Sequence, residues 1–173
     1  MSSVFFDIET VSQYKDFESL KNADPTLAKH WEKRADWYRR WYKKGSEDLS
    51  TMTTEEIYTR KAALQAEYGK IVCISVGQVK YGDDNLPFIN TKSFVGSEPE
   101  LLAEFLELVR NIESLQKFNF VGHNIDAFDI PFIAKRMITN EITPPSTFIV
   151  HNQKPWERSF VDTCKVWGSG AFA

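Results

Sequence analysis

The segment of residues 3–9, SVFFDIE, constrains the fold of this chain most, because its short apolar run ends in two acids. A run that is so largely apolar predicts a β-strand buried on both faces, in the middle of a sheet. The chain has 173 residues, of which 42% are hydrophobic, which is enough to build one domain with a core of this kind. We therefore expect a single domain over residues 1–173.

Strand and helix patterns alternate along the rest of the chain. Apolar residues at helical spacing predict an amphipathic helix over residues 25–44, and a capping box from Thr53 to Glu56 predicts a second helix that ends near Tyr68. Further strands are expected at 71–79, 88–95 and 118–122 and between 147 and 162, and further helices after Ser97 and over 129–140. This order predicts an α/β fold with a mixed sheet of about five strands flanked by helices, and with a helical insertion, about residues 14–67, after the first strand.

Composition and charge exclude several classes of protein. Lys and Arg number 21 and Asp and Glu number 24, a net charge of −3, which is not the balance of a protein that coats nucleic acid without specificity. No apolar run is long enough to span a bilayer, and the N-terminus lacks the basic region of a secretory signal. Cys73 and Cys164 form neither a zinc-binding nor a disulfide pattern. We expect a reduced, cytoplasmic protein with no membrane partner.

Asp7 and Glu9 are the first candidate site residues. They stand two apart on a predicted strand, so both side chains point to one face, about 7 Å apart at about 3.3 Å per residue. Two carboxylates at this spacing can ligate a pair of hard cations that lie about 3.5–4 Å from each other. The alternative is that they are solvated acids at the end of a strand.

Asp129 is the third candidate. A strand is predicted to end at Gly122, a polar loop containing His123 and Asn124 follows, and Asp129 begins the next helix. Asp129 either caps that helix or places a carboxylate beside the first strand, at the sheet edge where open α/β sheets bind ligands. A histidine in such a loop more often fixes the loop than acts as a base.

Two motifs together resemble those of the DEDD superfamily of 3′–5′ exonucleases, the DnaQ-like type. Residues 6–10, FDIET, are similar to the first motif. Residues 122–124, GHN, with 128–131, FDIP, resemble the second motif in the form seen in family-B polymerase-like exonucleases. Residues 69–75 and 160–163 are similar to further segments of that subgroup, so the resemblance runs along nearly the whole chain.

The resemblance implies a ribonuclease H-like fold and two-metal hydrolysis of a terminal phosphodiester at the 3′ end of single-stranded DNA, with RNA not excluded. Asp7, Glu9 and Asp129 would hold two Mg²⁺ or Mn²⁺ ions. Residues around Thr10 and Phe128 would position the terminal nucleotide. Asn124 would either contact the substrate or brace its loop, and the Phe128 ring is a stronger candidate for packing than for stacking.

The chain departs from the family pattern at its C-terminal end. The family carries a fourth carboxylate on a late helix, as Tyr-x-x-x-Asp or His-x-x-x-x-Asp, and neither spacing occurs among the six tyrosines and three histidines. We expect either a C-terminally incomplete piece of a longer enzyme or a short form with an impaired site that only binds nucleic acid or protein. Asp162 is a possible substitute ligand, although the alternative, that it caps the following turn, is favoured. A third alternative is a structural domain whose acids are only caps and surface charge.

A basic stretch lies within the predicted insertion. Residues 27–44 hold seven basic residues against two acids, a local balance of +5, and aromatic residues are interleaved with them. Cations mixed with aromatic rings suit single-stranded nucleic acid, through phosphate attraction and base stacking. One interpretation is therefore that a strand is guided by Arg39, Arg40, Trp37 and Trp41. The other is a helix with a buried aromatic face and a solvated basic face, which does not readily account for both tryptophans.

Overall fold

The computed structural model describes residues 2–44, 47–115, 118–149 and 159–168, and it divides into two compact units. The sheet unit comprises Met1–Glu9 and Ile71–Ala173, and the helical unit comprises Thr10–Lys70. The helical unit is therefore the predicted insertion with slightly wider limits. That both units form one domain stays a prediction.

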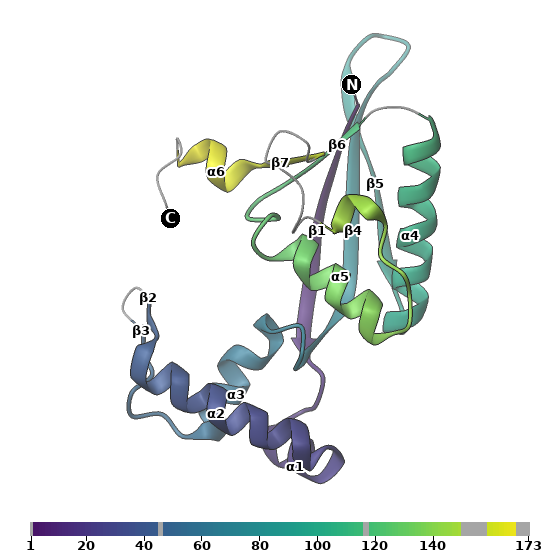
Figure 1. Cartoon of the computed structure of the whole chain (residues 1–173). Coiled ribbons are helices and arrows are strands. Elements are labelled where there is room, and N and C mark those ends of the chain that lie inside the picture. The colour runs from purple at the N-terminus through teal and green to yellow at the C-terminus, as the bar shows by residue number, and fades with distance from the viewer. Residues whose placement is uncertain (1, 45–46, 116–117, 150–158, 169–173) are drawn as a thin grey trace. The chain divides into compact units, whose positions relative to one another are not determined.

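The sheet unit contains a five-stranded mixed sheet (Figure 1) with the strand order β5-β4-β1-β6-β7. β4 and β5 form an antiparallel hairpin, β4 runs opposite to β1, and β6 and β7 run parallel to β1. A meander on one side of the first strand and parallel strands on the other is the arrangement of the predicted ribonuclease H-like fold. The strands are β1 Ser2–Ser12, β4 Gly69–Tyr81, β5 Pro87–Val95, β6 Phe118–Gly122 and β7 Phe160–Asp162.

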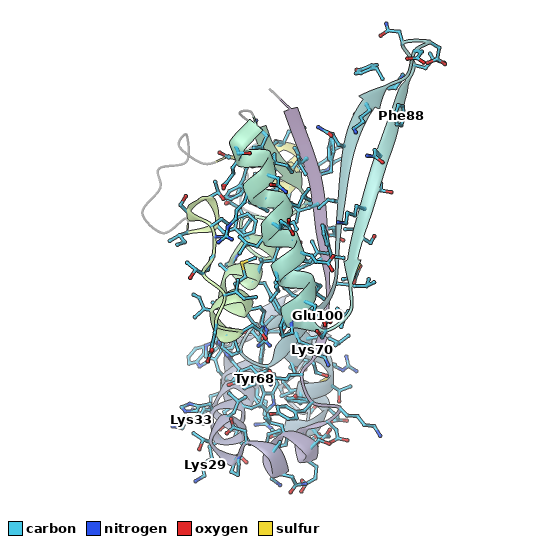
Figure 2. All side chains as sticks on the ribbon, turned by 90° about the vertical axis from the view of Figure 1, so that its right-hand side faces the viewer. Lys29, Lys33, Tyr68, Lys70, Phe88 and Glu100 are labelled. Atoms are coloured by element: carbon cyan, nitrogen blue, oxygen red, sulfur yellow. The ribbon has the colours of Figure 1, made fainter. Side chains whose placement is uncertain are left out.

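Two helices, α4 (Glu98–Leu115) and α5 (Asp129–Thr139), cover one face of this sheet (Figure 2). Phe6 of β1 lies at the centre of the core beneath them. Its ring packs against Phe120 of β6 at 5.2 Å between centroids and against Phe105 of α4 at 6.1 Å. A short 3₁₀ turn (Ser146–Phe148) adds Phe148 to the same cluster. Aromatic packing between the strands and α4 thus holds the middle of β1 in place.

β1 differs from the sequence prediction in one respect. Its even-numbered residues, Val4, Phe6 and Ile8, are buried, whereas Phe5, Asp7 and Glu9 are exposed. The prediction of a strand buried on both faces is therefore wrong. Within the described part of the chain, α4 and α5 cover only the even-numbered face, so the strand alternates with a period of two. The exposed face is the one that carries both acids.

A buried ion pair joins the two helices to β4. The Glu98 carboxylate accepts hydrogen bonds from Arg136 Nε at 2.9 Å and Nη2 at 2.5 Å, from Asn140 Nδ2 at 3.0 Å and from the amide of Ile71 at 2.7 Å. Burial alone would raise the pKa of Glu98, but these hydrogen bonds outweigh it and lower the pKa below its usual value. The start of α4, the end of α5 and the start of β4 are thereby tied together.

The helical unit has its own core. Trp31 is completely buried, and its ring contacts Tyr58 at 5.1 Å and Tyr68 at 4.7 Å between centroids. Asp24 caps α2, the longest helix of this unit, by accepting from the amide of Leu27 at 2.9 Å. The elements are α1 (Phe17–Ala23), α2 (Pro25–Trp41), β2 (Lys43–Lys44), β3 (Glu47–Asp48), α3 (Thr54–Lys61) and a 3₁₀ turn, η1 (Ala62–Leu64).

The capping box at Thr53 is confirmed, but the helix that follows ends earlier than expected. Glu56 Oε2 accepts from the Thr53 amide at 2.7 Å, and Thr53 Oγ1 accepts from the Glu56 amide at 3.2 Å. α3 stops at Lys61 instead of near Tyr68, because the chain turns at Gln65 to begin β4 at Gly69. α2 likewise ends at Trp41 and not at residue 44, because the next residues enter the small β2–β3 sheet. Among the described helices, none is long and apolar enough to cross a membrane.

Candidate active site

The Asp129 carboxylate reaches from the first residue of α5 to β1. β6 runs parallel to β1 with Val121 opposite Phe5, so the chain leaves β6 beside the acidic part of β1. Asp129 Oδ1 accepts a hydrogen bond of 3.2 Å from the amide of Ile8, which stands between Asp7 and Glu9. The Asp129 side chain is only 2% exposed. This places its carboxylate next to the predicted acid pair.

Two neighbouring acids act on the charge of Asp129. Burial and, after it, the negative charge of Asp7 raise the pKa of Asp129 to about 6, and Asp162 adds a smaller effect in the same direction. The interpretation of Asp129 as a helix cap is wrong, because Phe128 occupies the N-cap position. The carboxylate accepts a hydrogen bond from the Ile8 amide, and its own backbone amide acts on it in the same way. A buried acid whose charged neighbours are themselves acids is typical of functional sites.

Glu9 and Thr10 complete the first motif on β1, but the structure does not gather them into a closed cluster. Glu9 is exposed on the same face of β1 as Asp7. Within residues 2–44, 47–115, 118–149 and 159–168, no group of three His, Cys, Asp or Glu side chains lies close enough together to hold a metal ion. Thr10 belongs to the helical unit, and its substrate role stays a prediction.

Asp162 is engaged by backbone amides. Its Oδ1 accepts from Asn124 at 2.8 Å and from Cys164 at 3.0 Å, and its Oδ2 accepts from Asp126 at 3.2 Å. It therefore caps the short helix α6 (Thr163–Trp167), as the favoured alternative predicted, and holds the loop after β6. Its possible use as a substitute metal ligand stays a prediction.

The loop between β6 and α5 is fixed by its own contacts. His123 Nδ1 lies 3.1 Å from Thr163 Oγ1, and that hydroxyl donates to the Gly122 carbonyl at 3.0 Å. Asn124 has a left-handed backbone with φ of 62°, and its carbonyl accepts from the Phe128 amide at 3.0 Å. His123 thus braces the loop as expected, whereas the exposed Asn124 side chain remains a candidate for substrate contact.

The Phe128 ring packs against a neighbouring side chain of the fold. Its half-buried ring lies 5.4 Å from the Phe132 ring, which agrees with the expectation of packing over stacking. Phe5 is a candidate that the sequence analysis missed. It is 43% exposed and stands two residues before Asp7 on the same face of β1. The period-two alternation of a strand is the signal from which it could have been found.

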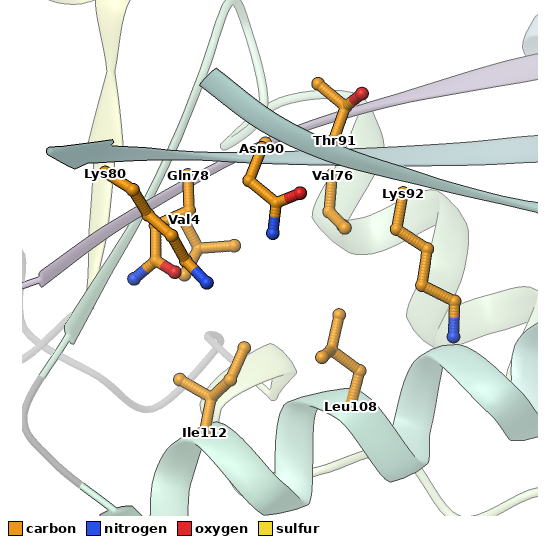
Figure 3. A pocket seen from close by; sticks show the side chains of 10 residues that line it. Val4, Val76, Gln78, Lys80, Asn90, Thr91, Lys92, Leu108 and Ile112 are labelled. Carbon is orange, nitrogen blue, oxygen red and sulfur yellow. The ribbon is translucent and has the colours of Figure 1, made fainter. Parts of the chain in front are cut away.

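Among the described residues, hollows lie on both faces of the sheet. One of about 330 Å³ lies between the hairpin and α4 (Figure 3), lined by apolar residues such as Val76 and Leu108 with Lys80 and Lys92 among the others, and it holds none of the predicted site residues. The other, of about 490 Å³, lies on the exposed sheet face, and Asp7 and Phe5 belong to its lining together with Ser75, Gly77, Val79, Ile89, Thr91 and Ser93. Of these two hollows, the second includes one of the candidate acids, Asp7, in its lining.

The donor set fits a divalent cation in its chemistry. Asp7, Glu9 and Asp129 offer carboxylate oxygens, the ligands that Mg²⁺ and Mn²⁺ prefer. Among the ion pairs of the described residues, none involves the buried Asp129 carboxylate. The charged groups that act on it are the acids Asp7 and Asp162. A bound cation would offset that repulsion.

The four residues predicted to guide a strand of nucleic acid lie on α2, and their surroundings differ. The Arg39 guanidinium is used in hydrogen bonds within the helical unit. Its Nε donates to the Met52 carbonyl at 2.9 Å, and its Nη atoms donate to Asp36 at 2.5 Å and to Thr54 Oγ1 at 2.6 Å. Arg40, Trp37 and Trp41 are exposed.

Comparison with known proteins identifies the family. No curated protein matches this chain. Among solved structures, a family B DNA polymerase from the hyperthermophilic archaeon Pyrobaculum calidifontis matches at 14% identity and a TM-score of 0.47, over 96% of this chain and 16% of that one. The chain thus spans less than a fifth of that polymerase. Residues 1–164 match the family described as DNA polymerase family B, exonuclease domain. This chain belongs to the family of DNA polymerase family B exonuclease domains.

Proposed function

We propose that this chain is a metal-dependent 3′–5′ exonuclease domain that hydrolyses the terminal phosphodiester of single-stranded DNA. The observation that carries the proposal is the buried Asp129 carboxylate, which the Ile8 amide holds beside Asp7. The family supports an exonuclease fold and a DNA-related hydrolase. The single-stranded 3′ end as substrate, with RNA as a second possibility, and a cytoplasmic location are our proposals.

Asp7, Glu9 and Asp129 would hold two Mg²⁺ or Mn²⁺ ions. Exonuclease domains of this family generally use divalent metals. Such ions lower the pKa of a bound water and stabilise the oxygen that leaves. The chain's own contribution is positional, because the Ile8 amide fixes the orientation of Asp129 relative to the backbone that carries Asp7 and Glu9. Asp129 must also lose its proton before it can ligate a cation, so its raised pKa makes cation binding depend on pH around 6.

The terminal nucleotide would lie against the exposed face of β1. Phe5 lines the hollow beside Asp7 and is exposed, so its ring would contact a base or sugar. Thr10, Asn124 and Phe128 remain proposed substrate contacts, because all three belong to the segments that resemble the family motifs. Of these, the Asn124 side chain is exposed and Phe128 is half-buried.

A second candidate function is binding without turnover. It is favoured by the absence of any three-ligand group among the described residues. In that case the chain would hold nucleic acid or a protein partner on the same fold.

Degradation of a 5′-labelled single-stranded oligonucleotide in Mn²⁺ tests the proposal and separates the two candidates. We expect wild type to give a ladder that shortens from the 3′ end, and Asp7→Ala to give none. Asp83→Asn is the matched control, because Asp83 is an exposed acid in the hairpin turn. No cleavage by wild type, with intact nucleic-acid binding, would favour the binding module. Equal cleavage by Asp7→Ala would reject the proposed site.

A further inference from the structure

The outer face of α2 carries an arrangement of side chains that the carboxylate site does not use. Ala28, Trp31, Ala35 and Tyr38 form the buried stripe of this helix. On the opposite side, at helical spacing, five exposed residues form what we call the α2 outer face, and Figure 2 labels its first two members. They are Lys29, Lys33, Trp37, Arg40 and Trp41.

The two tryptophans of this face are unusually exposed. Trp37 is 45% and Trp41 70% exposed, although the same helix buries Trp31 completely. The Trp37 ring is held in place by Tyr38, edge-on at 5.3 Å, and by the Arg34 guanidinium at 5.9 Å. The α2 outer face therefore presents two exposed indole rings one helical turn apart, both accessible to a flat partner.

The cations of this face are open to solvent as well. Among the described residues, none of Lys29, Lys33 and Arg40 is in an ion pair. α2 contains two acids: Glu32, which is adjacent to Lys33 in sequence, and Asp36, which is paired with Arg39. The face therefore has a net positive charge even though the whole chain carries −3. A polyanion would be attracted to it.

We propose that the α2 outer face binds single-stranded nucleic acid, with phosphates at Lys29, Lys33 and Arg40 and bases stacked on Trp37 and Trp41. Phosphate attraction and base stacking are the two parts that sequence-independent single-strand binding combines. From Lys29 to Trp41 the helix rises about 18 Å, which is long enough for several nucleotides. The proposal extends the proposed function, whose substrate is the same kind of polymer, but it does not depend on turnover.

A membrane surface is the main competing partner for a basic helix with tryptophans. An interfacial helix inserts its apolar face into the lipid. The apolar face of α2 is already buried in the core of the helical unit, around Trp31 and Tyr38. The exposed indoles share the face with the cations, which suits a partner that offers phosphates and flat rings together.

The test is the affinity of the full chain for fluorescein-labelled oligo(dT), measured by anisotropy in EDTA so that no hydrolysis occurs. We expect Trp41→Ala to weaken binding about tenfold. We expect the Lys29→Gln/Lys33→Gln/Arg40→Gln variant to reduce the dependence of log affinity on log salt by about two. The controls are Trp167→Ala, which removes a tryptophan that is 89% exposed in the sheet unit, and Lys21→Gln, which removes an exposed lysine of α1. Both should bind like wild type.

The proposal is overturned if the α2 variants bind oligo(dT) as wild type does, or if the two control variants lose affinity equally. It is also overturned if wild type binds vesicles of anionic phospholipid but not oligo(dT), and if Trp41→Ala reduces the affinity for these vesicles only. Circular dichroism verifies that each variant is folded. Wild type that binds through this face without cleaving DNA would reject the proposed exonuclease function and leave this inference standing.

Discussion

The amide of Ile8 donates a hydrogen bond of 3.2 Å to Oδ1 of Asp129, across 121 residues of sequence. This contact joins the two motifs of the candidate site, because Ile8 stands between Asp7 and Glu9. It also explains why Asp129 is buried without serving as a helix cap. A carboxylate placed so close to another acid has a consequence for the protein's stability that can be measured.

The first prediction concerns pH. The pKa of Asp129 is raised to about 6 in the folded chain from 3.8, so the folded state binds the proton more tightly than the unfolded state does. Stability from this group is therefore complete below about pH 4 and is lost as the pH rises through about 6. In EDTA, the free energy of unfolding of wild type relative to Asp129→Asn should fall by about 1–3 kcal/mol over that range. Chemical denaturation at several pH values measures it.

The control for this prediction is Asp83→Asn, which should follow wild type at every pH. Asp7→Asn should lower the pKa of Asp129, because it removes a neighbouring negative charge. Carbon-13 NMR titration of the Asp129 carboxyl group reads this directly. A pKa that is the same with and without the Asp7 charge would contradict the proximity of the two acids.

The second prediction concerns divalent cations. If Asp7 and Asp129 bind Mn²⁺ in the folded state only, the ion stabilises that state by mass action. At a Mn²⁺ concentration of about 100 times the dissociation constant, the gain is about 2.7 kcal/mol. Melting temperatures with and without Mn²⁺ should therefore differ for wild type and not for Asp7→Ala. Identical behaviour of the two proteins in Mn²⁺ would remove the metal site from the account.

The third prediction concerns Gly122, at the end of β6. A Cβ atom at this position would lie 2.2 Å from Ile125 Cγ2 and 2.8 Å from the Phe6 carbonyl oxygen. Gly122→Ala should therefore destabilise the chain by about 1–3 kcal/mol and disturb the loop that leads to Asp129. Gly77→Ala is the matched control, because its Cβ would approach no atom closer than 3.6 Å. If urea denaturation shows equal stability for both variants, the close packing at Gly122 is refuted.

The fourth prediction concerns the ion pair of Glu98 and Arg136, whose side chains are both buried. Arg136→Ala leaves the Glu98 carboxylate buried without its cation, which should cost about 3–5 kcal/mol. Lys21→Ala breaks the exposed pair with Glu18 and should cost less than about 1 kcal/mol. Thermal unfolding compares the two variants. A loss from Arg136→Ala as small as that from Lys21→Ala would show that the buried pair contributes little.

Local signals were sufficient for much of the fold. The apolar run before Asp7, the hairpin strands and the Thr53 capping box each occur close to where the sequence predicts them. The sequence did not predict the ends of helices that are determined by contacts with residues far away in the chain. α3 ends early because the chain must turn into β4, and no local pattern records that requirement.

For the candidate site, the sequence predicted the acids but not their partners. Whether Asp129 caps its own helix or reaches another strand is decided by β1 lying beside β6, which is a long-range property. Arg39 was grouped with Arg40 because both are basic neighbours, yet only the structure shows that Arg39 bonds to Met52 and Thr54.

The claim on which this account rests is that Asp7 and Asp129 act together as ligands of one metal site. Titration of wild type, Asp7→Asn and Asp129→Asn with Mn²⁺ at pH 7.5, followed by the electron paramagnetic resonance of the free ion, tests it most directly. We expect wild type to bind Mn²⁺, both variants to bind it more than about tenfold more weakly, and Asp83→Asn to bind it as wild type does. Wild-type affinity in either variant, or no binding by wild type, would contradict it.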